Sequence, residues 1–183
     1  MIIKENILSE ILYLRTLTLE DCTEKYVNWL NNIEVNRYLE TRFYVQNQEM
    51  IKDFVVGVNN SEDSYLFGIF TDDNIHIGNI KIGPIHPIYK YADISYFIGD
   101  TLFRGKGFAK NAIKLVLKFG FNQLNLNRIQ AGVHGTNISS QKVLEKCGFI
   151  KEAELRKKIF FEKENEIIWD DHYFYGILRI EYI

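Results

Sequence analysis

Hydrophobic residues recur along this chain with two periods, and the period changes from segment to segment. Residues 12–15 are short and largely apolar, which predicts a strand, whereas residues 18–30 carry apolar side chains at helical spacing. The helical spacing returns in residues 34–39 and again after Asn47. We therefore expect the chain to open with one strand followed by three helices.

From residue 65 onward the pattern changes to that of strands. Apolar runs at residues 65–70 and 75–82 flank a turn-forming Asp-Asp-Asn cluster, so they predict an antiparallel hairpin. Residues 91–98 and 128–133 are further strand candidates. Between them, residues 108–120 place apolar side chains along one face of a helix.

The C-terminal part of the chain predicts one more helix and a closing hairpin. Asn137 suits the N-cap of a helix whose apolar face includes Val143 and Leu144, and Gly148 suits its left-handed C-terminal end. Alternating, aromatic-rich runs around Asn165 predict the hairpin. Because there are only two prolines, no linker and no internal repeat, we expect residues 1–183 to form a single α+β domain with helices on both faces of one sheet.

Composition and charge narrow the classes of function. The chain has 183 residues, 46% of them apolar, and its net charge of -2 provides no basic field for nucleic acid or an anionic membrane. Cys22 and Cys147 lie outside any metal-binding cluster, which predicts buried, reduced thiols and no metal site. The N-terminus lacks a signal-peptide pattern and no apolar run approaches the ~20 residues of a membrane span, so a cytoplasmic protein is expected.

A basic, glycine-containing turn follows the strand at residues 91–98. In the segment from Arg104 to Ala109, Arg-Gly-Lys-Gly-Phe-Ala, the glycines permit close backbone approach, and the helix that follows presents its N–H groups and the positive end of its dipole. Arg104 and Lys106 add positive charge. Such a turn can hold a pyrophosphate or can do no more than start a helix, and because it matches neither GxGxxG nor GxxxxGK[ST] it disfavours a dinucleotide or nucleoside triphosphate site.

Two motifs in this order resemble the GNAT superfamily of N-acetyltransferases. The pyrophosphate loop of that family has Arg or Gln, two residues, Gly, one residue, and Gly or Ala, which Arg104, Gly107 and Ala109 match. The later pattern N-x-x-S-x-x-x-L-E-K-x-G-F runs from Asn137 to Phe149 and is similar to the branch that includes ribosomal-protein N-terminal acetyltransferases. The resemblance is specific over these motifs and extends more weakly over nearly the whole chain.

The resemblance implies a fold and a cosubstrate. The fold would be a mixed, mostly antiparallel sheet of about six to seven strands, with a splay between the fourth and fifth strands. The cosubstrate would be acetyl-CoA, its pyrophosphate on the glycine loop and its pantetheine arm in the splay. The cofactor-binding residues implied in this way are Ile98, Gly99, Arg104, Gly105, Lys106, Gly107, Phe108, Ala109 and Asn137.

Transfer of an acetyl group from a thioester to an amine requires a neutral amine, stabilisation of the oxyanion and a proton for the departing thiolate. Many family members carry the acid as a tyrosine seven residues after the asparagine, where this chain has Leu144, so Ser140 is the substitute candidate. Some relatives have a basic glutamate where this chain has Gly132, so the candidate bases are Asp93 and His134.

The acceptor site of the family is built from the first two helices and the final hairpin. The segment from Tyr26 to Arg42 is similar to acetyltransferases of surface-polysaccharide and nucleotide-sugar pathways, which implies an amino-sugar acceptor. Arg37, Glu40 and Arg42 are the substrate-binding candidates, because an arginine suits a diphosphate. The alternatives are acetylation of a protein N-terminus and a noncatalytic CoA-binding regulatory domain. The aromatic residues 173–175 leave a homodimer open.

Overall fold

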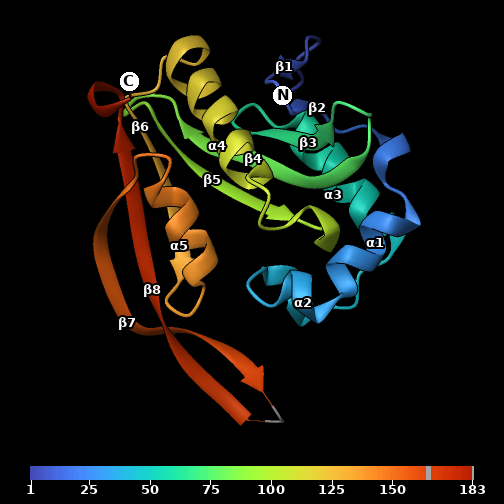
Figure 1. The fold of residues 1–183 in the computed structure, drawn as a ribbon, viewed down its shortest axis with the longest axis vertical. Helices are drawn as coiled ribbons and strands as arrows, with labels where there is room; N and C mark the ends of the chain where they lie inside the picture. The colour runs from blue at the N-terminus through green and yellow to red at the C-terminus, as the bar shows by residue number, and fades with distance from the viewer. Residues whose placement is uncertain (164–165, 183) are drawn as a thin grey trace.

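One eight-stranded sheet runs through the computed structural model, which describes residues 1–163 and 166–182 (Figure 1). The strand order is β1-β2-β3-β4-β5-β6-β8-β7, and all neighbours are antiparallel except β5 and β6, which are parallel. The strands are β1 (Ile7–Leu8), β2 (Leu12–Thr16), β3 (Tyr65–Thr71), β4 (His76–His86), β5 (Tyr91–Ile98), β6 (Arg128–His134), β7 (Ile150–Lys163) and β8 (Glu166–Leu178).

Helices cover both faces of the sheet, as expected from the alternation of side chains along the strands. Leu66 and Phe67 are consecutive in β3, yet Leu66 packs with Tyr26 and Val55 on one face and Phe67 belongs to the core of the other. The helices are α1 (Glu24–Asn31), α2 (Ile33–Asn36), α3 (Gln48–Asn60), α4 (Phe108–Lys118) and α5 (Ile138–Glu145), with 3-10 turns at Leu19–Asp21, Glu40–Phe43, Thr101–Phe103 and Arg179–Glu181 and a π turn at Phe119–Gln123.

Asparagine side chains cap the first turns of α2, α3 and α5, at Asn32, Asn47 and Asn137. The Oδ1 atom of Asn47 accepts the amide of Met50 at 2.9 Å, and that of Asn137 accepts the amide of Ser140 at 3.2 Å. Each such cap stabilises a helix by about 1 kcal/mol. Gly148, with φ of +91°, follows α5 in the left-handed conformation. The helix limits predicted from the sequence at Asn47, Asn137 and Gly148 are thus confirmed.

The sheet has one more strand than the upper estimate from the sequence. The extra strand is β1, whose two residues pair as Ile7 with Leu14 and Leu8 with Tyr13. Two residues are too few to show an alternating pattern, so the sequence carried no signal for this strand.

The expected splay lies between β5 and β6, which are the fourth and fifth strands counted from β2. In the described part of the chain their parallel pairing joins residues 91–93 to residues 128–130 and stops there. Beyond that point the strands diverge, so the backbone groups along one edge of β5 have no neighbouring strand at its end.

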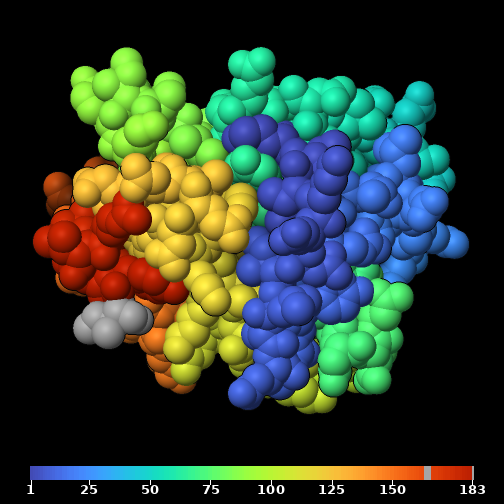
Figure 2. All heavy atoms as spheres, turned by 90° about the horizontal axis from the view of Figure 1, so that it is seen from above, coloured from blue at the N-terminus to red at the C-terminus, as the bar shows by residue number. Residues whose placement is uncertain are grey.

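The two ends of the chain lie at the end of the sheet that is away from this opening (Figure 1). Figure 2 shows the N-terminal residues beside α4, and residues 3–8 line a shallow hollow together with Lys118 and Phe119. The long hairpin of β7 and β8 extends beyond the body of the sheet in Figure 1, below α5 and opposite α2. The splay therefore opens between α2 on one side and α5 on the other.

Candidate active site

The glycine loop joins the end of β5 to the start of α4. Gly105 and Gly107 have φ values of +72° and +88°, a region that glycine adopts without steric cost. Gly107 is the N-cap of α4, and no side chain caps the helix there. An added Cβ would meet nothing within 4 Å at Gly105 and only the Asn111 amide nitrogen, at 3.7 Å, at Gly107. The loop thus presents backbone amides and the helix dipole to open space, as a pyrophosphate requires.

A cleft of about 510 Å³ extends from this loop to the residues around the splay, and we call it the cofactor cleft. Among the described residues, its charged lining consists of Arg104, Lys110 and Lys146 against one carboxylate, Glu34. This excess of positive charge suits an acyl donor that carries phosphates. The remaining lining residues are Val35, Tyr38, Leu39, Tyr96, Phe97, Ile98, Phe103, Gly105, Gly107, Phe108, Ala109, Asn137, Ser139, Ser140 and Val143.

Two of the nine implied cofactor-binding residues do not line this cleft. Lys106 is exposed, with its Nζ 5.8 Å from the centroid of the Phe103 ring. Gly99 is buried against Trp29, where an added Cβ would lie 2.2 Å from the indole ring, and its amide donates to the Ile77 carbonyl at 2.9 Å. The structure thus gives Gly99 a packing role, and its contact with the pantetheine arm stays a prediction from the resemblance.

The Arg104 side chain holds the mouth of the cofactor cleft together. Its Nε and Nη2 atoms donate to the carbonyl of Ile98 at 3.1 and 3.0 Å, and its Nη1 donates to the carbonyl of Glu34 at 3.0 Å. These bonds tie α2 to the end of β5. Arg104 therefore fixes the geometry of the loop and adds charge to it, while the amides at the start of α4 remain for the phosphates.

A second cleft, of about 440 Å³, lies beside the first, and we call it the acceptor cleft. Tyr38, Leu39, Tyr96 and Phe97 line both clefts, so the two meet at these residues. The charged residues on its wall are Glu40 and Lys81, and the rest of the wall is mainly apolar or aromatic: Tyr26, Leu30, Thr41, Gln46, Met50, Ile51, Phe54, Leu66, Asn79, Ile80 and Ser95.

Two hydroxyl groups pair where the clefts meet. The Tyr96 hydroxyl and the Ser140 Oγ are 2.8 Å apart, and the Asn137 cap holds the Ser140 backbone at the start of α5. Burial raises the pKa of Tyr96 to about 12, although the Ser140 hydrogen bond opposes this. The structure thus places Ser140, the acid candidate from the sequence, in the cofactor cleft. It adds Tyr96, which sequence reasoning missed because the residue lies in a strand 44 positions earlier.

The two candidate bases line neither cleft. Asp93 accepts a hydrogen bond from the Gln130 side chain at 3.2 Å, at the last paired position of β5 and β6. His134 is buried, with its ring centroid 5.2 Å from that of Tyr38 and its Nδ1 3.6 Å from the Asp170 carboxylate. Neither side chain is among the residues that line the two clefts, and a base role for Asp93 or His134 stays a prediction.

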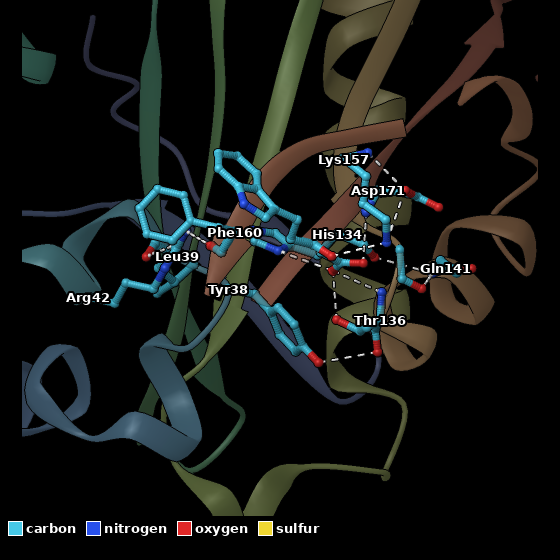
Figure 3. A network of polar contacts seen from close by, with 12 residues as sticks. Tyr38, Leu39, Arg42, His134, Thr136, Gln141, Lys157, Phe160 and Asp171 are labelled. Atoms are coloured by element: carbon cyan, nitrogen blue, oxygen red, sulfur yellow. Dashed lines mark hydrogen bonds and ion pairs between the residues drawn. The ribbon is translucent and has the colours of Figure 1, made fainter. Parts of the chain in front are cut away.

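The surroundings of His134 form a polar network that supports the cleft wall (Figure 3). The Asp170 Oδ2 atom of β8 accepts the Thr136 amide at 3.1 Å and the Thr136 hydroxyl at 2.7 Å. From the other side, the Tyr38 hydroxyl donates to the Thr136 carbonyl at 3.2 Å. The network therefore holds the turn between β6 and α5, and with it the start of the helix that carries Ser140.

Burial of histidines makes the stability of this protein sensitive to acid. Burial lowers the pKa values of His76, His134 and His172 below the usual 6.5. The unfolded chain then binds protons that the folded chain does not. The stability contributed by these neutral histidines is therefore fully present above about pH 6.5 and is lost as the pH falls toward the lowered pKa values. We expect the melting temperature to fall between about pH 7.5 and 5.5, and a His134→Gln variant to lose less on acidification. Equal losses in both proteins would contradict a role for His134.

The predicted substrate residues face two different hollows. Glu40 lines the acceptor cleft, whereas Arg37 and Arg42 line a neighbouring hollow of about 480 Å³ that also contains Phe43 and Phe161. Of the two arginines, Arg37 is exposed. Its guanidinium carbon is 4.8 Å from the centroid of the Tyr38 ring.

The Arg42 side chain is already occupied by backbone contacts. It is only 8% exposed, and it donates to the carbonyls of Leu39 at 2.8 Å and Phe160 at 3.0 Å. Arg42 thereby joins the segment after α2 to the β7–β8 hairpin. Arg37 and Glu40 are consequently the two predicted substrate residues whose charged groups are accessible.

The cysteines have a structural setting. Cys22 and Cys147 are both free and buried, and burial raises the pKa of Cys147 to about 11. A thiol with such a pKa is a poor nucleophile at neutral pH. Across residues 1–163 and 166–182, no helix is long and apolar enough to cross a membrane and no cluster of three or more His, Cys, Asp or Glu side chains could hold a metal ion.

Comparison with known proteins shows the family to which the chain belongs. The acetyltransferase (GNAT) domain model matches residues 12–150, and the chain therefore belongs to the GNAT acetyltransferase family. A probable N-acetyltransferase of Bacillus subtilis, YjcK, is 41% identical over 121 residues, which are 64% of each chain. An uncharacterized N-acetyltransferase of Bacillus licheniformis, p20, is 32% identical over 97% of this chain and 98% of its own.

A solved structure shares the fold. The spermidine N-acetyltransferase of Vibrio cholerae, in complex with CoA and spermine, superposes with a TM-score of 0.84 at 24% identity, covering 93% of this chain and 97% of its own. The family membership makes the protein an acyltransferase that uses acetyl-CoA. The open glycine loop and the basic cofactor cleft fit that cosubstrate.

Proposed function

We propose that the protein transfers the acetyl group of acetyl-CoA directly to the primary amine of a nucleotide-linked amino-sugar. The observation that carries the proposal is the meeting of two clefts at Tyr38, Leu39, Tyr96 and Phe97, one of them basic and next to the glycine loop. Direct transfer needs donor and acceptor side by side, and two clefts that share a wall provide this proximity.

Acetyl-CoA supplies the activated acetyl group, and the residues of the chain bind it and orient it. The amides at the start of α4 and the side chains of Lys110 and Lys146 would hold the phosphates. Leu39 and Phe97 would exclude water from the junction, and Ser140 with Tyr96 would supply a proton there.

The shape and charge of the acceptor side support a sugar nucleotide. Aromatic rings such as Tyr26 and Phe54 offer flat apolar surfaces for the ring of a sugar, and Glu40 can accept hydrogen bonds from its hydroxyl or amino groups. In the neighbouring hollow, which Glu34 and Glu162 also line, Arg37 provides a guanidinium for a diphosphate, and Phe43 and Phe161 offer rings on which a base could stack.

A polyamine is the second candidate, because the spermidine N(1)-acetyltransferase of Vibrio cholerae is 32% identical over 84 residues, 46% of this chain and 48% of its own. A polycation, however, is expected to pair with several carboxylates, and of the residues that the structure describes Glu40 is the one acidic residue on the wall of the acceptor cleft, while Glu34 and Glu162 line the neighbouring hollow. The peptide N-terminus remains the third, since an apolar first residue would suit the same wall.

The test is thiol release from acetyl-CoA with a UDP-linked amino-sugar, spermidine and a short peptide with a free N-terminus. We expect the highest kcat/KM with the amino-sugar nucleotide. Arg37→Ala should raise the KM for it about tenfold, roughly the loss of one charge-assisted hydrogen bond, whereas Arg156→Ala on β7 should leave it unchanged. A preference for spermidine or the peptide would overturn the acceptor assignment, and CoA binding without turnover on any amine would favour a noncatalytic role.

A further inference from the structure

The junction of the two clefts contains two tyrosine hydroxyls, and they differ in what they can do. The Tyr38 hydroxyl donates to the carbonyl of Thr136 at 3.2 Å, so its proton is held by an acceptor that cannot return one. The Tyr96 hydroxyl faces the Ser140 Oγ at 2.8 Å, and a serine hydroxyl can either accept or donate. Tyr96 can therefore release its proton and be reprotonated by its own partner.

The position seven residues after Asn137 cannot serve this purpose here. Leu144 occupies it, is fully buried, and packs in the core on the α4 side of the sheet. It offers neither a proton nor access to either cleft. The junction thus needs a donor from another element, and β5 places one at the point where the pairing with β6 has ended.

The protonation state of Tyr96 is suited to donation. Burial raises its pKa to about 12, so the hydroxyl keeps its proton at neutral pH. Besides Tyr96, the hydroxyl side chains of the cofactor cleft are Tyr38, Ser139 and Ser140. Of these, Ser139 and Ser140 do not line the acceptor cleft, so Tyr96 alone combines a place at the junction with a partner that can replace its proton.

We infer that Tyr96 is a catalytic residue that protonates the departing thiolate, with Ser140 as the second hydroxyl of a short relay. The inference rests on the proposed acetyl transfer. As the amine nitrogen bonds to the acetyl carbon and the C–S bond breaks, the sulfur receives the Tyr96 proton. Ser140 returns a proton to Tyr96, and the proton lost by the amine nitrogen restores Ser140 through solvent, so that an amide and a free thiol are the products.

The kinetic test compares Tyr96→Phe, Ser140→Ala and the double variant. We expect Tyr96→Phe to lower kcat about 100-fold, at the low end of general acid catalysis, with the Kd for CoA unchanged. Ser140→Ala should have a smaller effect, and the double variant should be no slower than Tyr96→Phe because the hydroxyls act in series. Tyr65→Phe on β3, whose ring packs on Phe67 and Phe119, is the matched control and should retain full activity.

A second measurement needs no acceptor. A hydroxyl that donates to the sulfur favours the thiolate, so Tyr96→Phe should raise the pKa of the thiol of bound CoA by about one, a tenfold change in its acid dissociation constant. The absorbance of the thiolate measures this pKa. Normal CoA binding with an unchanged thiol pKa and unchanged kcat in Tyr96→Phe would overturn the inference and leave the proposed function standing. Failure of the parent protein to bind CoA would instead overturn the proposed function.

Discussion

Gly107→Asp is expected to reduce the affinity for acetyl-CoA by at least about 100-fold. The substitution places a carboxylate at the N-cap of α4, where the pyrophosphate is to bind, and two like charges about 4 Å apart near a protein surface repel by up to about 4 kcal/mol. The φ of +88° at this position adds strain for any side chain. Calorimetric titration of the purified variant with acetyl-CoA measures the effect.

Two further variants separate charge from strain and from general damage. Gly107→Ala introduces the strain alone and should cost much less affinity. Gly57→Asp adds the same charge on the exposed side of α3, where an added Cβ meets nothing within 4 Å, and should bind acetyl-CoA like the parent. If Gly107→Asp bound acetyl-CoA as tightly as Gly57→Asp, the assignment of the phosphate site to the glycine loop would be wrong.

Asp170→Ala is expected to lower the free energy of unfolding by about 2–4 kcal/mol and to reduce kcat as well. The Asp170 carboxylate is buried and accepts both the amide and the hydroxyl of Thr136, and its loss leaves these donors without a partner inside the protein. The turn that precedes α5 would loosen, and Ser140 with it. Urea unfolding gives the stability, and acetyl-CoA turnover at a temperature where the variant is folded gives kcat.

The matched control is Glu154→Ala. Glu154 forms an exposed ion pair with Lys151 at 2.8 Å, a kind of contact that contributes at most about 1 kcal/mol. The free energy of unfolding of Asp170→Asn should lie between those of Asp170→Ala and Glu154→Ala, because an amide oxygen can still accept one hydrogen bond from Thr136. Stability of Asp170→Ala equal to that of Glu154→Ala would show that the network does not hold the turn.

Much of the fold could be predicted from the sequence, because the local periodicity of apolar residues and the residues that start or end helices agree with the tertiary arrangement. The residue limits of β5 coincide with the predicted strand, and Asn47 and Asn137 start helices as expected. The glycine loop could also be predicted, since all its residues are contiguous and its conformation is one that glycine adopts without steric cost.

Sequence reasoning did less well where the site depends on contacts between distant segments. Ala92, Ile94, Tyr96 and Ile98 alternate along β5, so Tyr96 is indistinguishable by period from its core neighbours. Asp170 lies in the middle of an alternating strand, and nothing local marks it as the partner of Thr136. His134 and Asp93 lie near strand ends, but neither lines a cleft, since His134 is buried and Asp93 is half-buried beside Gln130.

The sequence by itself therefore determined most of the elements, the glycine loop and the family, each of which is encoded within a short contiguous stretch. Only the tertiary structure decided which polar groups reach the clefts. The cause is the divergence of β5 and β6 after residues 93 and 130, which exposes one edge of the end of β5 and lets α5 bring Ser140 to Tyr96. Such an arrangement depends on how whole elements pack, and no local pattern of residues carries it.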